Sequence, residues 1–257
     1  MKVHVWGSLS GTEPFPDMHH TSWALEKDGI LYWFDAGEGC SRTAHLQGYD
    51  VRRIKKLFIS HSHSDHVGGL FNLFTLMRKL DALKIAPVGT DIEAVVPDPE
   101  VVELVKKLVD ISDSWMPGIK VAVRKTAEGL LTDEDGITVE CVRNCHMTPR
   151  SDGSGCSYSF RIRSEGKTII FSGDVKNSDE IDCFLKDGCD LLMMETGHHS
   201  APALCQEWKE KKYAIGQVMF VHHGRAIIAD PEGVKAQCEA VWGAPVIIAH
   251  DGLEFEL

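Results

Sequence analysis

Residues 61–66, with the sequence HSHSDH, place three imidazoles and a carboxylate within six positions. These are donors that zinc, iron and manganese accept in proteins. His61 and His63 are two residues apart, so on an extended segment they face the same side and can share one ion. Asp65 and His66 follow where the chain turns toward a helix, and there they can bind a second ion. A metal site is therefore favoured over a solvated polar loop.

Later residues of metal-binding type come at, or shortly after, the ends of apolar runs that read as strands. They are His146, Asp174 and the pair His222 and His223. Because α/β sheets gather their sites at the carboxyl ends of strands, we expect these residues to join the same site. Whether His222 or His223 joins the site depends on the register, because a slip of one residue reverses the direction of a side chain.

The elements that must position these residues are predicted from the hydrophobic pattern. Strands are expected at 3–6, 23–26, 30–34, 56–60, 85–88, 119–123, 137–142, 158–162, 168–171, 191–194, 218–221 and 246–249. Helices are expected at 68–80, 99–111, 203–212 and 231–242. Hairpins and helices occur in both halves of the chain, which favours a layered α/β sandwich over a purely parallel sheet.

Composition narrows the class of protein. The 257-residue chain has a formal net charge of −11, which argues against a protein that mainly coats nucleic acid or an anionic membrane. No uncharged apolar run approaches the ~18 residues of a membrane span, and the first residues do not read as a signal peptide. The eight cysteines lack the spacing of a structural zinc site. We therefore expect reduced thiols in a cytoplasmic protein.

The HSHSDH segment matches the H-x-H-x-D-H motif of the metallo-β-lactamase superfamily, and His146, Asp174 and His222 match its later ligand motifs in order. Within that superfamily the chain resembles the ribonuclease Z-like branch over nearly its whole length. The further segments that carry this resemblance are DAGEG at 35–39, GTEP at 11–14, METGHHS at 194–200, VHHGR at 221–225 and AHDG at 249–252.

The resemblance implies a four-layer αββα sandwich, formed by a single domain of residues 1–257, with two divalent ions. The first ion would be bound by His61, His63 and His146. The second would be bound by Asp65, His66 and His222, with Asp174 bridging the two ions. Zinc is favoured, with manganese or iron as alternatives, because nitrogen and oxygen ligands suit all three.

The same resemblance suggests how a hydrolase would work. A hydroxide bridging the ions would be the nucleophile, and Asp65 is expected to accept its proton. Glu195 with His198 or His199 would deliver a proton to the leaving group. Which of these two histidines acts stays open, and support of the metal ligands is an alternative role for both.

The chain also departs from the tRNA-processing members of the branch. Those members carry a long flexible arm between the third histidine and the aspartate, whereas His146 and Asp174 are only 28 residues apart here. Met194 also replaces the first histidine of the family's H-E-A-T motif. With the net charge of −11, the short interval disfavours a large RNA and favours a small or medium anionic substrate.

We therefore expect a dinuclear metal-dependent hydrolase, with a phosphodiester as the favoured bond. Hydrolysis of a thioester, lactone or sulfate ester by the same site is one alternative. A tRNA 3′-processing endonuclease and a non-catalytic metal-binding sensor are two others. The resemblance also implies a homodimer, and no membrane partner is expected.

Overall fold

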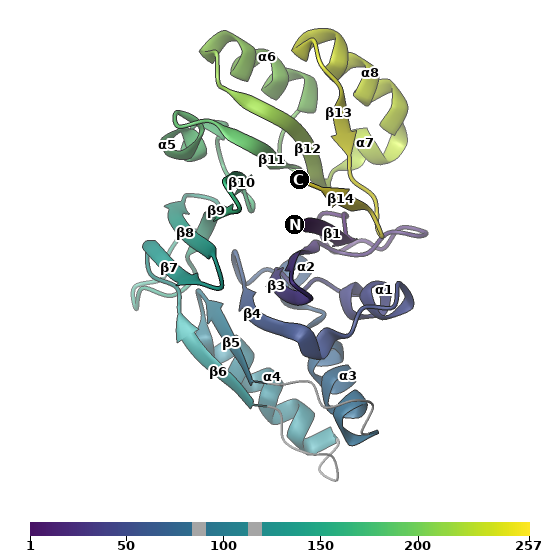
Figure 1. Ribbon diagram of the computed structural model, residues 1–257, viewed down its shortest axis with the longest axis vertical. Helices are drawn as coiled ribbons and strands as arrows, with labels where there is room; N and C mark the ends of the chain where they lie inside the picture. Colours follow the sequence, from purple (N-terminus) through teal and green to yellow (C-terminus); the bar gives the residue numbers. More distant parts are fainter. Residues whose placement is uncertain (84–90, 113–119) are drawn as a thin grey trace. The chain divides into compact units, whose positions relative to one another are not determined.

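Two seven-stranded β-sheets, each with its own helices, organise the chain (Figure 1). The computed structural model describes residues 1–83, 91–112 and 120–257, so the predicted strand at 85–88 lies outside the described residues. The chain divides into two compact units. Unit 1 contains Met1–Ser8, Thr12–Thr126 and Asp251–Glu256, and unit 2 contains Leu9–Gly11, Ala127–His250 and Leu257. The single domain of residues 1–257 stays a prediction.

The sheet of unit 1 has the strand order β14-β1-β2-β3-β4-β5-β6. Its strands are β1 (Lys2–Gly7), β2 (Ser22–Lys27), β3 (Ile30–Phe34), β4 (Ile54–Phe58), β5 (Asp91–Val96), β6 (Lys120–Lys125) and β14 (Glu254–Glu256). Strands β3 to β6 are parallel to one another, whereas β14, β1, β2 and β3 pair in antiparallel fashion. The parallel part therefore brings the carboxyl ends of β3, β4 and β5 to one edge.

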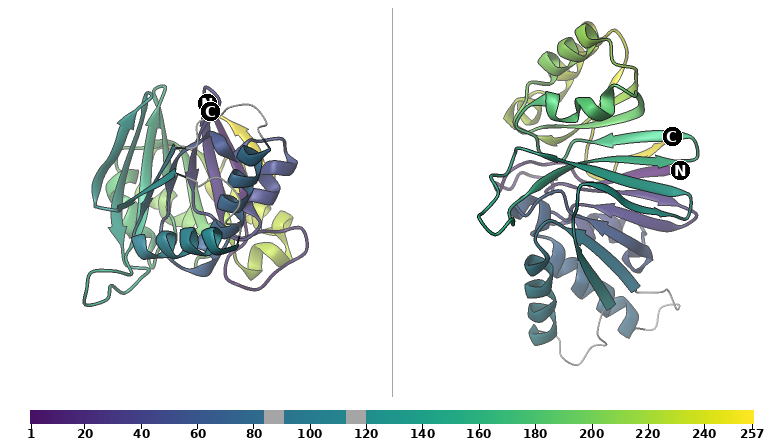
Figure 2. Two further views of the ribbon diagram at one scale, coloured as in Figure 1. Left: turned by 90° about the horizontal axis from the view of Figure 1, so that it is seen from below. Right: turned by 90° about the vertical axis from the view of Figure 1, so that its left-hand side faces the viewer.

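Helices lie against unit 1's sheet (Figure 2), and they pack on it through an apolar stripe. The helical segments are α1 (Cys40–Leu46), η1 (Val51–Arg53), α2 (Ser64–Val67), α3 (Leu70–Ala82) and α4 (Pro99–Ser112). Leu73 and Met77 of α3 and Val102 and Val109 of α4 are fully or almost fully buried in one cluster with sheet residues. The helices predicted at 68–80 and 99–111 are thus confirmed, because their 3.6-residue apolar period has a sheet to pack on.

The sheet of unit 2 has the order β13-β12-β11-β10-β9-β8-β7. Its strands are β7 (Gly129–Glu134), β8 (Ile137–Asn144), β9 (Ser157–Ser164), β10 (Lys167–Phe171), β11 (Cys189–Thr196), β12 (Ile215–His223) and β13 (Val246–Ile248). Strands β7 to β10 form antiparallel hairpins, and β10 to β13 are parallel. The carboxyl ends of β8, β10, β11 and β12 consequently lie on the same side of the sheet.

Unit 2 buries the inner faces of its helices on one side of this sheet. Its helical segments are η2 (Ser178–Ile181), α5 (Asp182–Leu185), α6 (Ala201–Lys211), α7 (Arg225–Ala229) and α8 (Pro231–Trp242). Trp208 of α6 is fully buried in one cluster with Phe220 of β12 and Cys238 of α8. The predicted pattern of helices alternating with strands after residue 190 is therefore confirmed.

Three strands were not predicted, namely β5, β7 and the three-residue strand β14. β5 at Asp91–Val96 was not expected because Asp91 and Glu93 interrupt its apolar run, but Glu93 forms ion pairs with Lys56 and Arg124 of the flanking strands. β7 was also not expected, although it joins β8 through a tight turn at residues 135–136. Among the described residues, none of the helices has the length and apolar character that crossing a membrane requires.

Candidate metal centre

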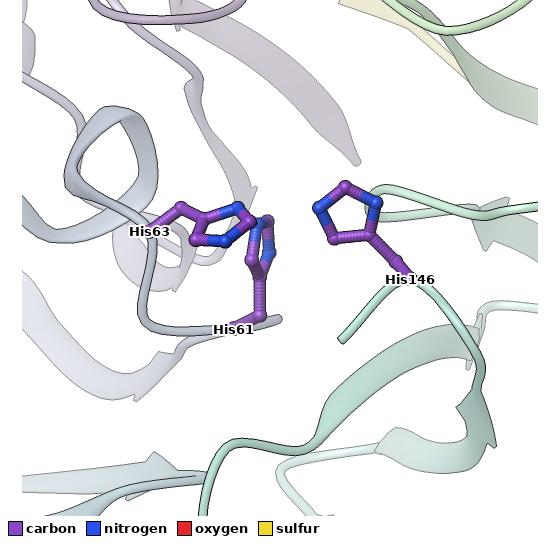
Figure 3. A group of neighbouring side chains, drawn as sticks. All are labelled: His61, His63 and His146. Atoms are coloured by element: carbon purple, nitrogen blue, oxygen red, sulfur yellow. The ribbon is translucent and has the colours of Figure 1, made fainter. Parts of the chain in front are cut away.

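The HSHSDH segment follows β4, on the side of unit 1's sheet where its parallel strands have their carboxyl ends. The imidazoles of His61 and His63 turn toward each other, with Nε2 of His61 2.9 Å from Nδ1 of His63 (Figure 3). The carbonyl of His63 then accepts the backbone N–H of His66 at 3.0 Å, which begins the short helix α2. This turn buries Asp65 and His66 and leaves His63 exposed. The segment therefore holds two separate pairs of donors: His61 and His63 before α2, and the buried Asp65 and His66 within it.

A buried carboxylate, Asp35, supports the segment from the loop after β3. It accepts hydrogen bonds from the backbone N–H of Ser60 at 2.7 Å and from its hydroxyl at 2.8 Å. Nδ1 of His66 lies 2.8 Å from the same carboxylate. Because an ionised carboxylate only accepts, Nδ1 carries the proton, and Nε2 of His66 has the lone pair that a metal requires. The DAGEG segment was noted in the sequence, but this role of Asp35 was not predicted.

Close backbone packing holds the loop after β3 against the HSHSDH segment. A side chain at Gly37 would place its Cβ 2.4 Å from the carbonyl carbon of His20 and 2.5 Å from the carbonyl oxygen of Asp65. Real Cβ contacts are essentially never so short, so only glycine fits this position. Gly37 is thus a backbone requirement of the half-site in unit 1.

In unit 2, Asp174 follows β10 and lies among imidazoles. Its Oδ2 atom is 3.3 Å from Nε2 of His222, 3.6 Å from Nε2 of His146 and 4.0 Å from Nδ1 of His198. His146 comes from the loop after β8 (Figure 3) and His222 from the end of β12. Ligand atoms of His146, Asp174 and His198 lie within 4.8 Å of one another. This set of one carboxylate and several imidazoles fits a divalent ion.

The adjacent histidines His222 and His223 have different surroundings. The pairing of β11 with β12 shifts by one residue between Glu195 and Thr196, which makes His222 the extra residue of a β-bulge with φ of 50°. His223 lies 3.2 Å from the hydroxyl of Thr196 through Nδ1 and 2.7 Å from a backbone carbonyl of Ala249 through Nε2. Burial lowers the pKa of His223 to about 4, so it is neutral. Both ring nitrogens of His223 are thus engaged, and His222 is the one that lies beside Asp174.

Glu195, at the end of β11, is the fully buried carboxylate of unit 2's group. Its Oε1 atom lies 3.0 Å from Nδ1 of His198, and its Oε2 atom accepts the backbone N–H of the same residue at 2.9 Å. Burial alone would raise the pKa of Glu195, but hydrogen bonds and charges of His198 and His222 hold it below the usual range. The bond to Glu195 in turn raises the pKa of His198, against its partial burial.

His199 lies on the other side of Glu195 and is tied differently. Its Nε2 atom donates to the carbonyl of Val175 at 3.0 Å and lies 3.4 Å from Oε1 of Glu195. His198, with 45% of its side chain exposed, is the member of the pair that faces Asp174. The predicted residues are thus found in two groups, each at strand ends of its own unit: His61, His63, Asp65 and His66 in unit 1, and His146, Asp174, Glu195, His198, His199 and His222 in unit 2.

Comparison with known proteins adds the family to this geometry. Residues 32–234 match the model of the Beta-lactamase superfamily domain. The chain belongs to this superfamily. It is 30% identical to the ribonuclease Z of Picrophilus torridus over 224 residues, which are 85% of this chain and 62% of that protein. Over 71 residues, it is 39% identical to the ribonuclease Z of Treponema denticola, covering 28% of this chain and 23% of that protein. The chain thus matches less than two thirds of the length of these relatives.

Solved structures show the same fold over the whole chain. The metallo-β-lactamase fold protein YhfI from Bacillus subtilis has a TM-score of 0.76 at 15% identity, with 99% of this chain and 98% of that one covered. The short form of human tRNase Z has a TM-score of 0.69 at 20% identity, with 100% and 99% covered. The Zn²⁺-bound PqqB from Methylobacterium extorquens has a TM-score of 0.70 at 16% identity, with both chains fully covered.

These matches confirm the predicted superfamily, its metallo-β-lactamase fold and the resemblance to ribonuclease Z. They also support the predicted class, a metal-dependent hydrolase. The expectation that a large RNA is disfavoured gains no support, because the relatives include ribonucleases.

Proposed function

We propose that this superfamily member is a metal-dependent phosphodiesterase that acts on a small or medium-sized anionic substrate. The observation that carries this proposal is the position of Asp174 in unit 2. Its Oδ2 atom lies within 4.0 Å of three imidazoles. The buried carboxylate of Glu195 in turn lies beside two of them, those of His198 and His222. The relatives named ribonuclease Z support a phosphodiester, because this is the bond that links nucleotides in RNA.

Two divalent ions are proposed, with zinc favoured and manganese or iron as alternatives. Residues of both units would supply the ligands, in the order that the superfamily motifs imply. The first ion would be bound by His61, His63 and His146. The second would be bound by Asp65, His66 and His222, with Asp174 shared. When bound, such ions lower the pKa of a water molecule and offset charge on phosphate oxygens.

The remaining steps fall to side chains of this chain. Asp65 would accept the proton of the attacking water, because its carboxylate is at the start of α2 beside the ligands. His198 would give a proton to the leaving oxygen, and Glu195 would hold its ring through Nδ1. His199 is the weaker candidate for this step because its Nε2 atom already donates to a carbonyl.

A tRNA 3′-processing endonuclease is the second candidate, favoured by the 30% identity with a ribonuclease Z along 85% of this chain. The interval between His146 and Asp174 weighs against it. That interval holds a loop at residues 147–156 and the strands β9 and β10, which leaves no room for an RNA-gripping arm. The proposal therefore keeps a smaller substrate as the favoured one.

The test is a substrate panel with protein loaded with zinc or manganese. We expect turnover of bis-p-nitrophenyl phosphate, and loss of both turnover and metal retention in Asp174→Ala. His45→Ala is the matched control, because it removes an exposed histidine of α1. Turnover only of thioesters, lactones or sulfate esters would overturn the phosphodiester proposal. Metal binding without any turnover would indicate a sensor, and cleavage only of precursor tRNA would favour the endonuclease.

A further inference from the structure

Two carboxylates accept hydrogen bonds from the HSHSDH segment or the serine before it, and each follows one of the two strands that flank β4. Asp35 comes from the β3 side and binds Ser60 and His66, as described above. Asp98 comes from the β5 side, where its Oδ2 atom accepts a hydrogen bond from the hydroxyl of Ser62 at 2.8 Å. Because β3, β4 and β5 are parallel neighbours, both carboxylates reach the segment from the same edge of the sheet.

Asp98 is itself fixed in place. It is buried, with 7% of its surface exposed, and it lies between the end of β5 and the first residue of α4, Pro99. The residue before a proline is restricted to extended conformations, which limits its backbone. Its carbonyl accepts the backbone N–H of Val101 at 3.1 Å. A negative charge is also favourable beside the start of a helix.

Ser62 stands between the two histidines that face each other. In an extended segment the middle side chain points away from its two neighbours. The hydrogen bond to Asp98 therefore fixes the rotation of the segment about its own axis. That rotation decides whether His61 and His63 can present their nitrogens on the same side.

We infer that Asp98 is a positioning residue for the metal half-site formed by His61 and His63, acting through Ser62. The inference rests on the proposed function, because it takes these two histidines as metal ligands. Asp98 is not one of the proposed ligands. Its bond to Ser62 holds the two imidazoles in the arrangement that an ion requires, so that less freedom is lost when the ion binds. Partners beyond the ligands of other metal sites typically change metal affinity by about 10- to 100-fold.

The experiment measures zinc affinity of the full chain by competition with a chelating dye, and the visible absorption spectrum after loading with Co²⁺. We expect Ser62→Ala and Asp98→Ala each to weaken binding of one ion by about 10-fold or more. The double variant should lose no more than Asp98→Ala alone, because both substitutions remove the same bond. Asp98→Asn should restore most of the affinity, since its side-chain oxygen still accepts from Ser62.

Ser64→Ala is the matched control, because Ser64 is an exposed serine of the same segment. Thermal unfolding of metal-free protein separates a general loss of stability from the loss of affinity. Unchanged affinity in Ser62→Ala would overturn the inference, even if Asp98→Ala unfolds through damage to the start of α4. Additive losses in the double variant would also overturn it. Failure of the wild-type chain to bind zinc would instead contradict the proposed function, so the two failures are distinguishable.

Discussion

At the scale of single residues, backbone conformation decides which of two adjacent histidines can bind an ion. His222 occupies a β-bulge at positive φ, which is uncommon for a residue with a side chain. Bulges often occur beside active sites, where they redirect a side chain. His223 instead completes hydrogen bonds inside unit 2. The two neighbours should therefore fail in different ways when replaced.

His222→Ala should lose metal affinity, whereas His223→Ala should retain it. His223→Ala should leave the buried carbonyl of Ala249 without the imidazole that donates to it, which costs about 1–3 kcal/mol, whereas the hydroxyl of Thr196 keeps its bond to the carbonyl of Val221. Urea unfolding and zinc titration on both variants check this. The opposite pattern, with metal loss only in His223→Ala, would show that the ligand has been misassigned.

Glu195→Gln removes the charge that holds His198 and keeps the size of the side chain. If Glu195 orients the proton donor, kcat should fall by about 10²- to 10⁴-fold while KM changes little. Steady-state kinetics on a phosphodiester, with metal content measured alongside, checks this. Glu232→Gln is the control, because Glu232 is an exposed carboxylate of α8. A rise in KM without a change in kcat would contradict the proton-transfer role.

The ligand candidates could be predicted because their residue types follow apolar strands in the sequence. Their supporting partners could not. Asp35 lies 31 positions before His66, and Asp98 lies 36 positions after Ser62. The DAGEG segment marks Asp35 without indicating its partner, and nothing local marks Asp98, since both pairings arise only when β3, β4 and β5 align.

At the scale of elements, most strands and the four longest helices follow from the hydrophobic period, and two of the missed strands follow from turn chemistry or charge. The turn between β7 and β8 contains Asp135 and Gly136, with φ of 53° and 69°. An Asp-Gly pair with both angles positive is typical of a two-residue hairpin, and it was the signal that could have revealed β7. β5 is harder to predict, because Glu93 becomes compatible with a sheet only through Lys56 and Arg124.

Gly136→Ala should destabilise the β7–β8 hairpin by about 1–2 kcal/mol, because a side chain is disfavoured at its positive φ. Urea unfolding of the variant checks this value. Gly243→Ala is the matched comparison for this loss of stability, because Gly243 also has positive φ and open space where a Cβ would lie. Gly233→Ala would not serve, since a Cβ there would collide with Asp230. No loss of stability in Gly136→Ala would argue against this turn.

At the scale of the whole molecule, the buried histidine His4 makes a contribution to the pH dependence of stability that a substitution can isolate. His4 of β1 is fully buried, with Nε2 2.8 Å from Glu26 and Nδ1 3.7 Å from Glu254. Lys2 and Tyr49 are the other titratable groups around it. Burial lowers the pKa of His4, and the two carboxylates offset this only in part.

In the unfolded chain, His4 takes up its proton near pH 6.5. The folded protein takes it up only at lower pH, so the unfolded state binds more protons in this window. The contribution of His4 to stability is therefore complete above about pH 6.5 and falls as the pH decreases below it. The free energy of unfolding of His4→Phe should fall less steeply than that of wild type from about pH 7.5 to pH 5. Parallel profiles would contradict this assignment.

The pairing of β14 with β1 joins Lys2 to Glu256, near opposite ends of the sequence. Asp251 also accepts the backbone N–H groups of Ser8 and His19, at 2.9 Å and 2.6 Å. During synthesis the ribosome makes β1 before unit 2 and makes β14 only after all 124 residues of the 127–250 stretch of unit 2. Unit 1 must therefore wait, with one sheet edge open, until residues 254–256 have been made, whereas the main stretch of unit 2 can fold as it emerges.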